Sequence, residues 1–326
     1  MQILNLTPAA KTQHCGDFRG DFHEESCVPA DAIFLLGYFD GVHIGHQALI
    51  DEAHTLASCE SAAGHPIVIW TFEHMPKASA DSGLLTTKQE KCLVLSSLGA
   101  DYIIFEDFDA LRSLDGESFF IRHIASHSPY AVICGYDYRF GRMASCGPDD
   151  LAKFASDAGI RSKTISSRTL SGEVVSSTLI RTLISEGDMR KAADLLGRRY
   201  SFSSEVIHGK ELGRTIGRPT INQRFPADKV SPRHGVYSCT ASFTSDGRDY
   251  TFGGVCNIGY RPTVNNNEND ITVETYIIGF SGDLYGKDVK ISFAEYLRGE
   301  TKFSSVSELA EQIAKDEKDA KMSLGL

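Results

Sequence analysis

The sequence has no apolar run long enough to cross a membrane, and its first ten residues lack the apolar core of a signal peptide. Its 8 cysteines are scattered without a C-x-x-C pair or the spacing of a metal site, so reduced thiols are expected. A net charge of −10 argues against a general nucleic-acid binder. These absences predict a cytoplasmic protein with no membrane or nucleic-acid partner.

The first half of the chain has the pattern of an α/β protein. Short apolar runs alternate with helical patterns, which predicts a Rossmann-like, doubly wound parallel sheet. The expected strands cover residues 32–36, 66–72, 101–105, 130–134 and 160–165, and the expected helices cover residues 47–53, 87–98, 116–127 and 148–158. Residues 1–31 are either a poorly ordered lead-in or a short edge strand.

The pattern changes near Arg198, where short alternating strands separated by turns predict a small antiparallel β-barrel. Strands are expected at residues 200–208, 235–243, 250–258, 271–280 and 289–296, and helices at 176–185, 188–196 and 306–321. Acidic and basic side chains four apart in the last helix, such as Glu317 and Lys321, are expected on its solvated face. We place the domains at residues 1–186 and 187–326.

The segment GYFDGVHIGH, residues 37–46, stands between the first of these strands and its helix, where an open α/β sheet binds its ligand. Its glycines let the backbone approach a ligand, and the helix N-terminus offers N–H groups to a phosphate. His43 and His46 fall on neighbouring positions of one helix face, and two imidazoles can donate hydrogen bonds to charge that develops in a transition state. The alternative is a glycine-rich turn with two solvated histidines.

A second candidate anion site begins the helix at residues 176–185. Ser176 or Ser177 is a natural N-cap, and Arg181 lies about one turn inside, within reach of an anion at the same end. The competing interpretation is an ordinary capped helix with a surface arginine.

The antiparallel half carries its own glycine-rich segment, residues 209–220. It lacks the spacing of a phosphate-binding P-loop, and Pro219 would break the helix that such a loop requires. Thr220 and Asn222 offer two neutral oxygens to Mg²⁺. Glu274, within an expected strand, is either a surface residue or a base for a substrate hydroxyl.

Taken together, the chain resembles the bacterial bifunctional riboflavin kinases/FMN adenylyltransferases from about residue 33 to residue 316. The resemblance rests on eight segments in the family's order. They are residues 37–46, 135–141, 176–181, 213–222, 235–237, 257–263, 283–286 and 296–298.

For the first domain, an HxGH nucleotidyl transferase, the resemblance implies transfer of AMP from ATP to FMN. His43 and His46 would steady the α-phosphate, while Ser177 and Arg181 would hold the β- and γ-phosphates. Asp137 matches a position that the family uses near the flavin or the metal. The other residues expected to bind nucleotide or flavin are Gly37, Phe39, Asp40, Gly41, Gly45 and Thr178.

For the second domain, the resemblance implies phosphorylation of riboflavin by ATP. Thr220 and Asn222 would bind Mg²⁺ that arrives with ATP, Glu274 would activate the ribityl hydroxyl, and Arg298 would lie near the flavin. Gly213, Arg214 and Gly217 are expected to contact the nucleotide.

The sequence departs from the family pattern at Tyr276, where His is usual, and at Gly279, where Asp is usual. These departures leave an alternative in which only one half is active. A second alternative is a flavin- or nucleotide-binding regulator without turnover. The sequence does not determine the oligomeric state, the preferred divalent metal or whether FMN is channelled between sites.

Overall fold

A computed structural model describes residues 1–5, 28–59, 64–72, 83–209, 217–260 and 271–326. The chain divides into two compact units, Met1–Ser177 and Thr178–Leu326. None of the helices in the described ranges combines the length and the apolar character needed to cross a membrane.

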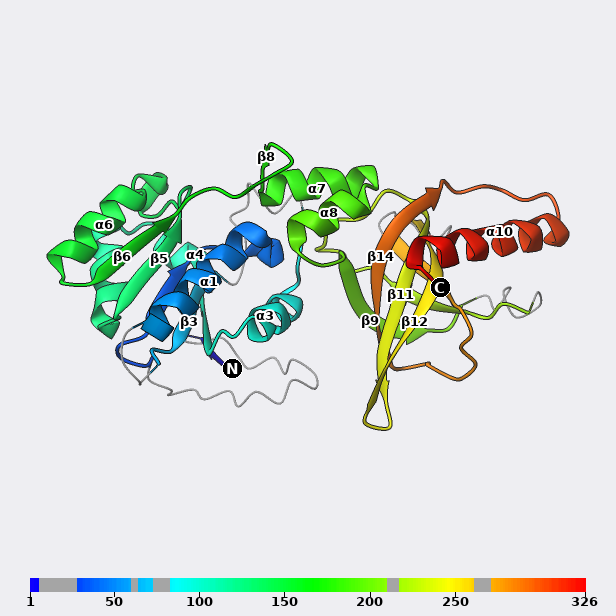
Figure 1. The fold of residues 1–326 in the computed structure, drawn as a ribbon, viewed down its shortest axis with the longest axis horizontal. Helices are drawn as coiled ribbons and strands as arrows, with labels where there is room; N and C mark the ends of the chain where they lie inside the picture. Colours follow the sequence, from blue (N-terminus) through cyan, green and yellow to red (C-terminus); the bar gives the residue numbers. More distant parts are fainter. Residues whose placement is uncertain (6–27, 60–63, 73–82, 210–216, 261–270) are drawn as a thin grey trace. The chain divides into compact units, whose positions relative to one another are not determined.

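The first unit is built on a parallel sheet with the strand order β1-β4-β3-β2-β5-β6 (Figure 1). Its strands are β1 (Gln2–Asn5), β2 (Ile33–Leu36), β3 (Ile67–Phe72), β4 (Tyr102–Glu106), β5 (Ala131–Gly135) and β6 (Arg161–Ile165). The order reverses at β2, which pairs with β3 on one side and β5 on the other. The predicted parallel sheet is confirmed, and β1 is an edge strand.

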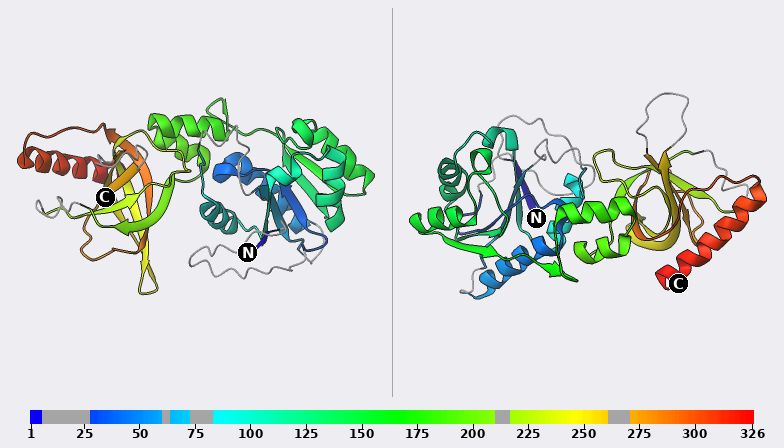
Figure 2. Two further views of the ribbon diagram at one scale, coloured as in Figure 1. Left: turned by 180° about the vertical axis from the view of Figure 1, so that it is seen from behind. Right: turned by 90° about the horizontal axis from the view of Figure 1, so that it is seen from above.

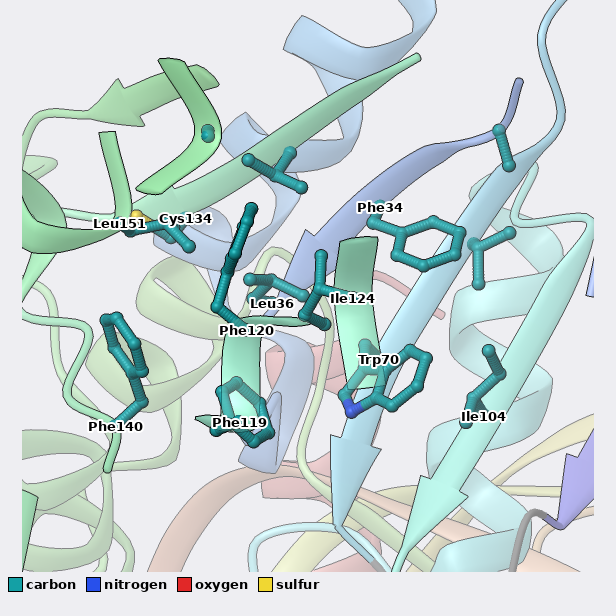
Figure 3. Close-up of a cluster of buried hydrophobic side chains, with 14 of the residues drawn as sticks. Phe34, Leu36, Trp70, Ile104, Phe119, Phe120, Ile124, Cys134, Phe140 and Leu151 are labelled. Atoms are coloured by element: carbon teal, nitrogen blue, oxygen red, sulfur yellow. The ribbon is translucent and has the colours of Figure 1, made fainter. Parts of the chain in front are cut away.

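Helices cover both faces of this sheet. On one face, α1 (Ile44–Cys59) and α3 (Lys88–Ser97) bury apolar residues against alternate side chains of β2, such as Ile33 and Leu35. On the other face, Phe34 and Leu36 pack with Trp70, as Figure 3 shows. The elements that cover this second face are α5 (Gly116–Phe119), the π-turn η2 (Phe120–Ile124), the 3₁₀ turn η3 (Ala125–His127) and α6 (Pro148–Asp157).

The single helix expected at residues 116–127 is therefore wrong in detail, because the structure has three consecutive segments there. Phe119, Phe120 and Ile124 are all buried in the same cluster (Figure 3). A π-turn has i→i+5 hydrogen bonds and is rare, so helical periodicity alone does not predict it. The short elements α4 (Phe108–Leu111), β7 (Thr169–Leu170) and β8 (Glu173–Val174) were also not expected.

The second unit contains a closed antiparallel barrel with the order β10-β13-β12-β11-β14-β9, which confirms the predicted barrel. Its strands are β9 (Ser201–Ile207), β10 (Thr220–Arg224), β11 (Gly235–Ser245), β12 (Arg248–Tyr260), β13 (Ile271–Ile277) and β14 (Asp288–Arg298). The right-hand view of Figure 2 looks into the barrel, with α10 (Val306–Leu324) along its outside. Tyr237 and Phe202 pack against Phe293 in its interior.

Two helices precede the barrel, α7 (Ser177–Glu186) and α8 (Met189–Leu196). Strand β10 was not expected from the sequence. It pairs with β13 along its whole length and with β9 at Asn222 and Gln223, and the buried amide of Gln223 also donates hydrogen bonds to the carbonyls of Ser204 (2.6 Å) and Val289 (2.7 Å). These bonds tie the segment after Pro219 into the barrel.

Candidate active sites

The turn that follows β2 is tight and has unusual backbone geometry. Phe39 (φ 54°), Gly41 (φ 77°) and Val42 (φ 43°) all lie in the left-handed region. A Cβ at Gly45 would stand 3.0 Å from the ring of His43, so only glycine fits without displacing that ring. Strain of this kind persists where the surrounding structure holds the backbone in place, and it occurs often at functional sites.

This turn brings the two predicted histidines together. The rings of His43 and His46 are stacked, with centroids 3.7 Å apart and an interplanar angle of 15°. Nδ1 of His43 accepts the main-chain N–H of His46 at 3.3 Å, so a neutral His43 ring carries its proton on Nε2. The ring of Phe39 lies 5.1 Å from that of His46. The stacking and this hydrogen bond thus hold the two rings at a fixed relative orientation.

Asp40, expected at the nucleotide, has its carboxylate directed into the protein. Its Oδ1 accepts the N–H groups of Leu85 (3.0 Å) and Thr86 (3.2 Å), and the hydroxyl of Thr86 accepts the N–H of Gly41 (3.2 Å). Asp40 therefore braces the turn against the segment that leads into α3.

Lys91 also contacts this turn, at Tyr38. Its Nζ donates to the carbonyl of Tyr38 at 2.8 Å and lies 4.2 Å from the centroid of the Tyr38 ring. Burial lowers the pKa of Lys91 to about 8, and the nearby carboxylate of Asp40 opposes that shift. Sequence reasoning missed Lys91 and Thr86, because a capping box at Thr87 and Glu90 marks the start of α3 but not which face of α3 is buried.

The segment after β5 emerges beside the segment after β2. Leu36 pairs with Cys134, so Gly37 and Gly135 occupy the next positions of neighbouring parallel strands. Asp137 is exposed, in a turn where the N–H of Tyr138 donates to the carbonyl of Gly135 at 3.1 Å. The two blocks predicted from sequence therefore meet where the strand order reverses, which is the ligand-binding edge of such sheets.

The first residue of α7, Ser177, contacts the turn that follows β2. Oγ of Ser177 donates to the main-chain carbonyl of Asp40 at 3.1 Å, and Thr178 is exposed next to it. Arg181 lies one turn further along α7, in the second unit.

A buried carboxylate lies at the carboxyl end of β4. Oε1 of Glu106 is 3.1 Å from Nδ1 of His123, and burial raises the pKa of Glu106 while His123 opposes the shift. Sequence reasoning missed this pair, because its two residues belong to different elements.

In the barrel, three polar residues stand side by side on neighbouring strands. Asn222 of β10 pairs with Glu274 of β13, which pairs with Asn257 of β12. The side chain of Glu274 is exposed, and Thr220 lies on the same face of β10 as Asn222. The structure thus brings together the predicted base and the predicted metal-binding oxygens, and adds Asn257.

The residues that depart from the family pattern lie close to this row. Tyr276 pairs with Thr220, and Gly279 is exposed at a left-handed position with φ +74°. Gly217 is likewise exposed with φ +72°, whereas the predicted Gly213 and Arg214 lie outside the described residues.

Arg298, expected near the flavin, forms an ion pair with α10. Its Nη2 lies 2.7 Å from Oδ2 of the buried Asp316. Next to it, Glu317 binds Lys321 at 2.8 Å as a four-residue spacing predicts, but it also binds Arg218 at 2.9 Å. The expectation that Glu317 lies on a solvated face is therefore wrong: its side chain is only 15% exposed.

Within the described ranges, no group of three or more His, Cys, Asp or Glu side chains is arranged to hold a metal ion. The neutral oxygens of Thr220 and Asn222 fit a divalent cation that keeps several waters and phosphate oxygens as ligands. A Cβ at Gly209 would meet the amide of Asn222, so the main chain passes close to this side chain.

Comparison with known proteins gives a match for each unit. Residues 26–179 match the family described as FAD synthetase, and residues 196–324 match the family described as riboflavin kinase. A crystal structure described as a macrolide-efflux protein from Streptococcus pneumoniae has the same fold. Its TM-score is 0.81 at 28% identity, over 90% of this chain and 95% of that one.

Curated relatives match over nearly their whole length. A bifunctional riboflavin kinase/FMN adenylyltransferase from Listeria monocytogenes is 32% identical, over 89% of this chain and 91% of its own. The protein of that name from Escherichia coli is 32% identical, over 93% of this chain and 96% of its own length. The protein described here belongs to the family of bifunctional riboflavin kinases/FMN adenylyltransferases.

Proposed function

We propose that the two activities of this family are divided between two domains, with FMN adenylyltransferase in residues 1–186 and riboflavin kinase in residues 187–326. The enzyme converts riboflavin and ATP to FMN, and then FMN and a second ATP to FAD and pyrophosphate. The observation that supports this division is that each compact unit holds a separate polar cluster: the stacked His43 and His46 in one, and the row of Asn222, Glu274 and Asn257 in the other.

In adenylyl transfer, a phosphate oxygen of FMN attacks the α-phosphorus of ATP, and the bond to the β-phosphate oxygen breaks to release pyrophosphate. Negative charge grows on the α-phosphate oxygens as this happens. Nε2–H of His43 and the ring of His46 donate to that charge from a preorganised position, which is the arrangement that accelerates such steps most. Ser177 and Arg181 are assigned to the β- and γ-phosphates. Gly37, Phe39, Gly41, Gly45, Asp137 and Thr178 are assigned to nucleotide or flavin binding.

In riboflavin phosphorylation, the ribityl hydroxyl attacks the γ-phosphorus of ATP, and ADP leaves. Glu274 is assigned as the base that accepts the hydroxyl proton, and its exposed carboxylate and its pairing with Asn222 support this assignment. Thr220 and Asn222 would hold Mg²⁺ that arrives with ATP, and the metal supplies charge neutralisation at the phosphates. Gly213, Arg214 and Gly217 are assigned to the nucleotide, and Arg298 to the vicinity of the flavin.

ATP, riboflavin and FMN are the small-molecule partners of this enzyme, and we assign it no nucleic-acid or membrane partner. The cytoplasm is the proposed compartment. Buried unpaired thiols such as Cys239 and Cys256 support that assignment, since reduced cysteines are the rule there.

The test is to incubate the purified protein with riboflavin, ATP and Mg²⁺, and to separate the flavins over time. FMN should form first and FAD after it, and FMN supplied in place of riboflavin should give FAD directly. Formation of only one product would mean that a single half is active. Bound flavin with no product at all would identify a binding protein and overturn the proposal.

A further inference from the structure

The row that contains Glu274 continues around the outside of the barrel. Its paired residues, one from each of five neighbouring strands, are Asn222, Glu274, Asn257, Val236 and Arg298. The neighbours of Glu274 along β13, Val273 and Thr275, are buried in the interior. Because side chains alternate along a strand, the row itself faces outward.

Helix α10 lies against this outer face. Ala320 packs on Val236 of the row and on Val255 of β12. The hydroxyl of Ser323 is 2.9 Å from that of Ser238 on β11. The helix thus covers the barrel directly beside the polar part of the row.

Asp316 of α10 fixes one end of the row. Its carboxylate accepts Nε of Arg298 at 2.9 Å and Nη2 at 2.7 Å, and Gln312 donates to it at 2.8 Å. Asp316 is 3% exposed, so this two-point contact is shielded from water.

The segment after Arg298 links Arg298 to the neighbour of Glu274. Oε1 of Glu300 accepts the amide of Asn257 at 3.4 Å, and Asn257 pairs with Glu274. The carboxylate of Glu300 also lies directly over Gly259, where a Cβ would meet it.

Glu317, the next residue of α10, contacts the segment that leads into β10, the strand at the other end of the row. Its Oε2 accepts Nε of Arg218 at 3.2 Å and Nη2 at 2.9 Å. Arg218 precedes Pro219 and Thr220, the first residue of β10, and its guanidinium lies 5.9 Å from the centroid of the Tyr276 ring. The two adjacent acids therefore hold two arginines that lie on opposite sides of Glu274 along the barrel.

We propose that Asp316 and Glu317 are positioning residues for riboflavin phosphorylation. Asp316 acts through Arg298 and the contact between Glu300 and Asn257, and Glu317 acts through Arg218 and the start of β10. Neither acid is required to touch substrate. This inference rests on the proposed role of Glu274 with Thr220 and Asn222, because its effect is to keep those three groups in register. Displacement of a reacting group by about 1 Å can cost on the order of 100-fold in rate.

The variants are Asp316→Asn and Glu317→Gln, which keep the shape of each side chain and remove its charge. The matched control is Glu311→Gln, an exposed position of the same helix. Riboflavin titration by fluorescence gives the number of binding sites, so that kcat for FMN formation is expressed per site. FAD formation from supplied FMN is measured in the same samples.

We expect kcat per riboflavin site to fall on the order of 10-fold or more in both variants, with FAD formation from FMN unchanged. Glu311→Gln should match wild type, and Asp316→Glu should recover part of the loss because it restores the carboxylate. An unchanged or increased kcat per site would overturn the proposal, as would a loss accounted for wholly by fewer binding sites. If Asp316→Asn does not fold, Glu317→Gln decides.

Glu274→Gln separates this proposal from the proposed function. If that variant is inactive as a kinase while the α10 variants are fully active, only the positioning role fails. If Glu274→Gln retains full kinase activity, the proposed role of Glu274 as the base is overturned, and the positioning proposal that rests on it is overturned as well.

Discussion

The hydroxyl of Ser177 donates a hydrogen bond to the main-chain carbonyl of Asp40 at 3.1 Å, across 137 residues of sequence. Asp40 belongs to the strained turn between β2 and α1, and Ser177 is the first residue of α7. The bond fixes the beginning of α7 relative to the turn that carries His43. Two residues that are far apart in the sequence therefore meet at this turn.

Replacing Ser177 with Ala should lower the rate of FAD formation from FMN, because the link between α7 and the turn is lost. A neutral hydrogen bond of this kind contributes about 1 kcal/mol, which corresponds to a loss of roughly fivefold. Steady-state kinetics with FMN as substrate measure this loss of rate. Ser177→Thr, which keeps the hydroxyl, is the matched control. A Thr variant as slow as the Ala variant would show that the hydroxyl is not responsible.

His46→Ala should stop FAD formation while riboflavin is still converted to FMN. The loss of one preorganised donor to a developing charge costs on the order of 10²–10³ in rate. His54→Ala, two turns further along α1 on an exposed position, serves as the control. Near-normal FAD synthesis from supplied FMN would remove His46 from the mechanism.

Glu274→Gln should abolish FMN formation, because an amide does not accept the hydroxyl proton. The variant should still adenylylate FMN, since the first domain is untouched. A low residual kinase rate is compatible with the mechanism, because phosphoryl transfer depends strongly on positioning and charge stabilisation. Glu205→Gln, an exposed strand position of the same barrel, is the control. Loss of both activities in a folded protein would mean that the two domains are coupled.

Lys91 predicts a pH dependence of the stability of the first unit. Its pKa is about 8 in the folded protein, below its ordinary value of 10.5. Folding therefore disfavours the protonated form, so the stabilisation is present above pH 10.5 and is lost as the pH falls through 8. Relative to Lys91→Met, the wild-type melting temperature should rise by roughly 4–8 °C between pH 8 and 9.5.

Trp70 makes this measurement specific, because it is the one tryptophan of the chain and is buried in the first unit. Its fluorescence reports the unfolding of that unit. A constant difference between wild type and Lys91→Met over this pH range would show that Lys91 has an ordinary pKa.

Metal should arrive with ATP instead of residing permanently in either domain. Dialysis against a chelator should leave less than stoichiometric metal, and both activities should return when Mg²⁺ and ATP are added together. Elemental analysis of the dialysed protein checks the first point and flavin separation the second. Stoichiometric metal that survives the chelator would contradict this prediction.

The local pattern of the sequence predicted most elements, because hydrophobic periodicity decides whether a segment is a strand or a helix. It placed both histidines at the start of α1 and Glu274 in a strand. Strand β10 was missed because the contacts that define it are long-range: it pairs with β13 and β9, and the amide of Gln223 binds carbonyls of β9 and β14. No local spacing indicates such a contact.

The same limit applies to the ion pairs on α10. The chain has 33 basic and 43 acidic residues, and spacing predicted only pairs within one helix, such as Glu317 with Lys321. The contact of Asp316 with Arg298 depends on how the barrel closes and where α10 packs. The register that aligns Asn222, Glu274 and Asn257 likewise exists only in the folded barrel.

The closed barrel restricts where the length of this chain can change. Each strand is hydrogen-bonded on both sides, so deletion of one residue within β13 would turn Glu274 inward and expose the buried face of the strand. The tip between β11 and β12 is different, since Asp246 and Gly247 both have left-handed φ angles and lie outside the two strands. A peptide tag inserted at this tip should leave kinase activity intact, whereas a single residue added inside β13 should abolish it.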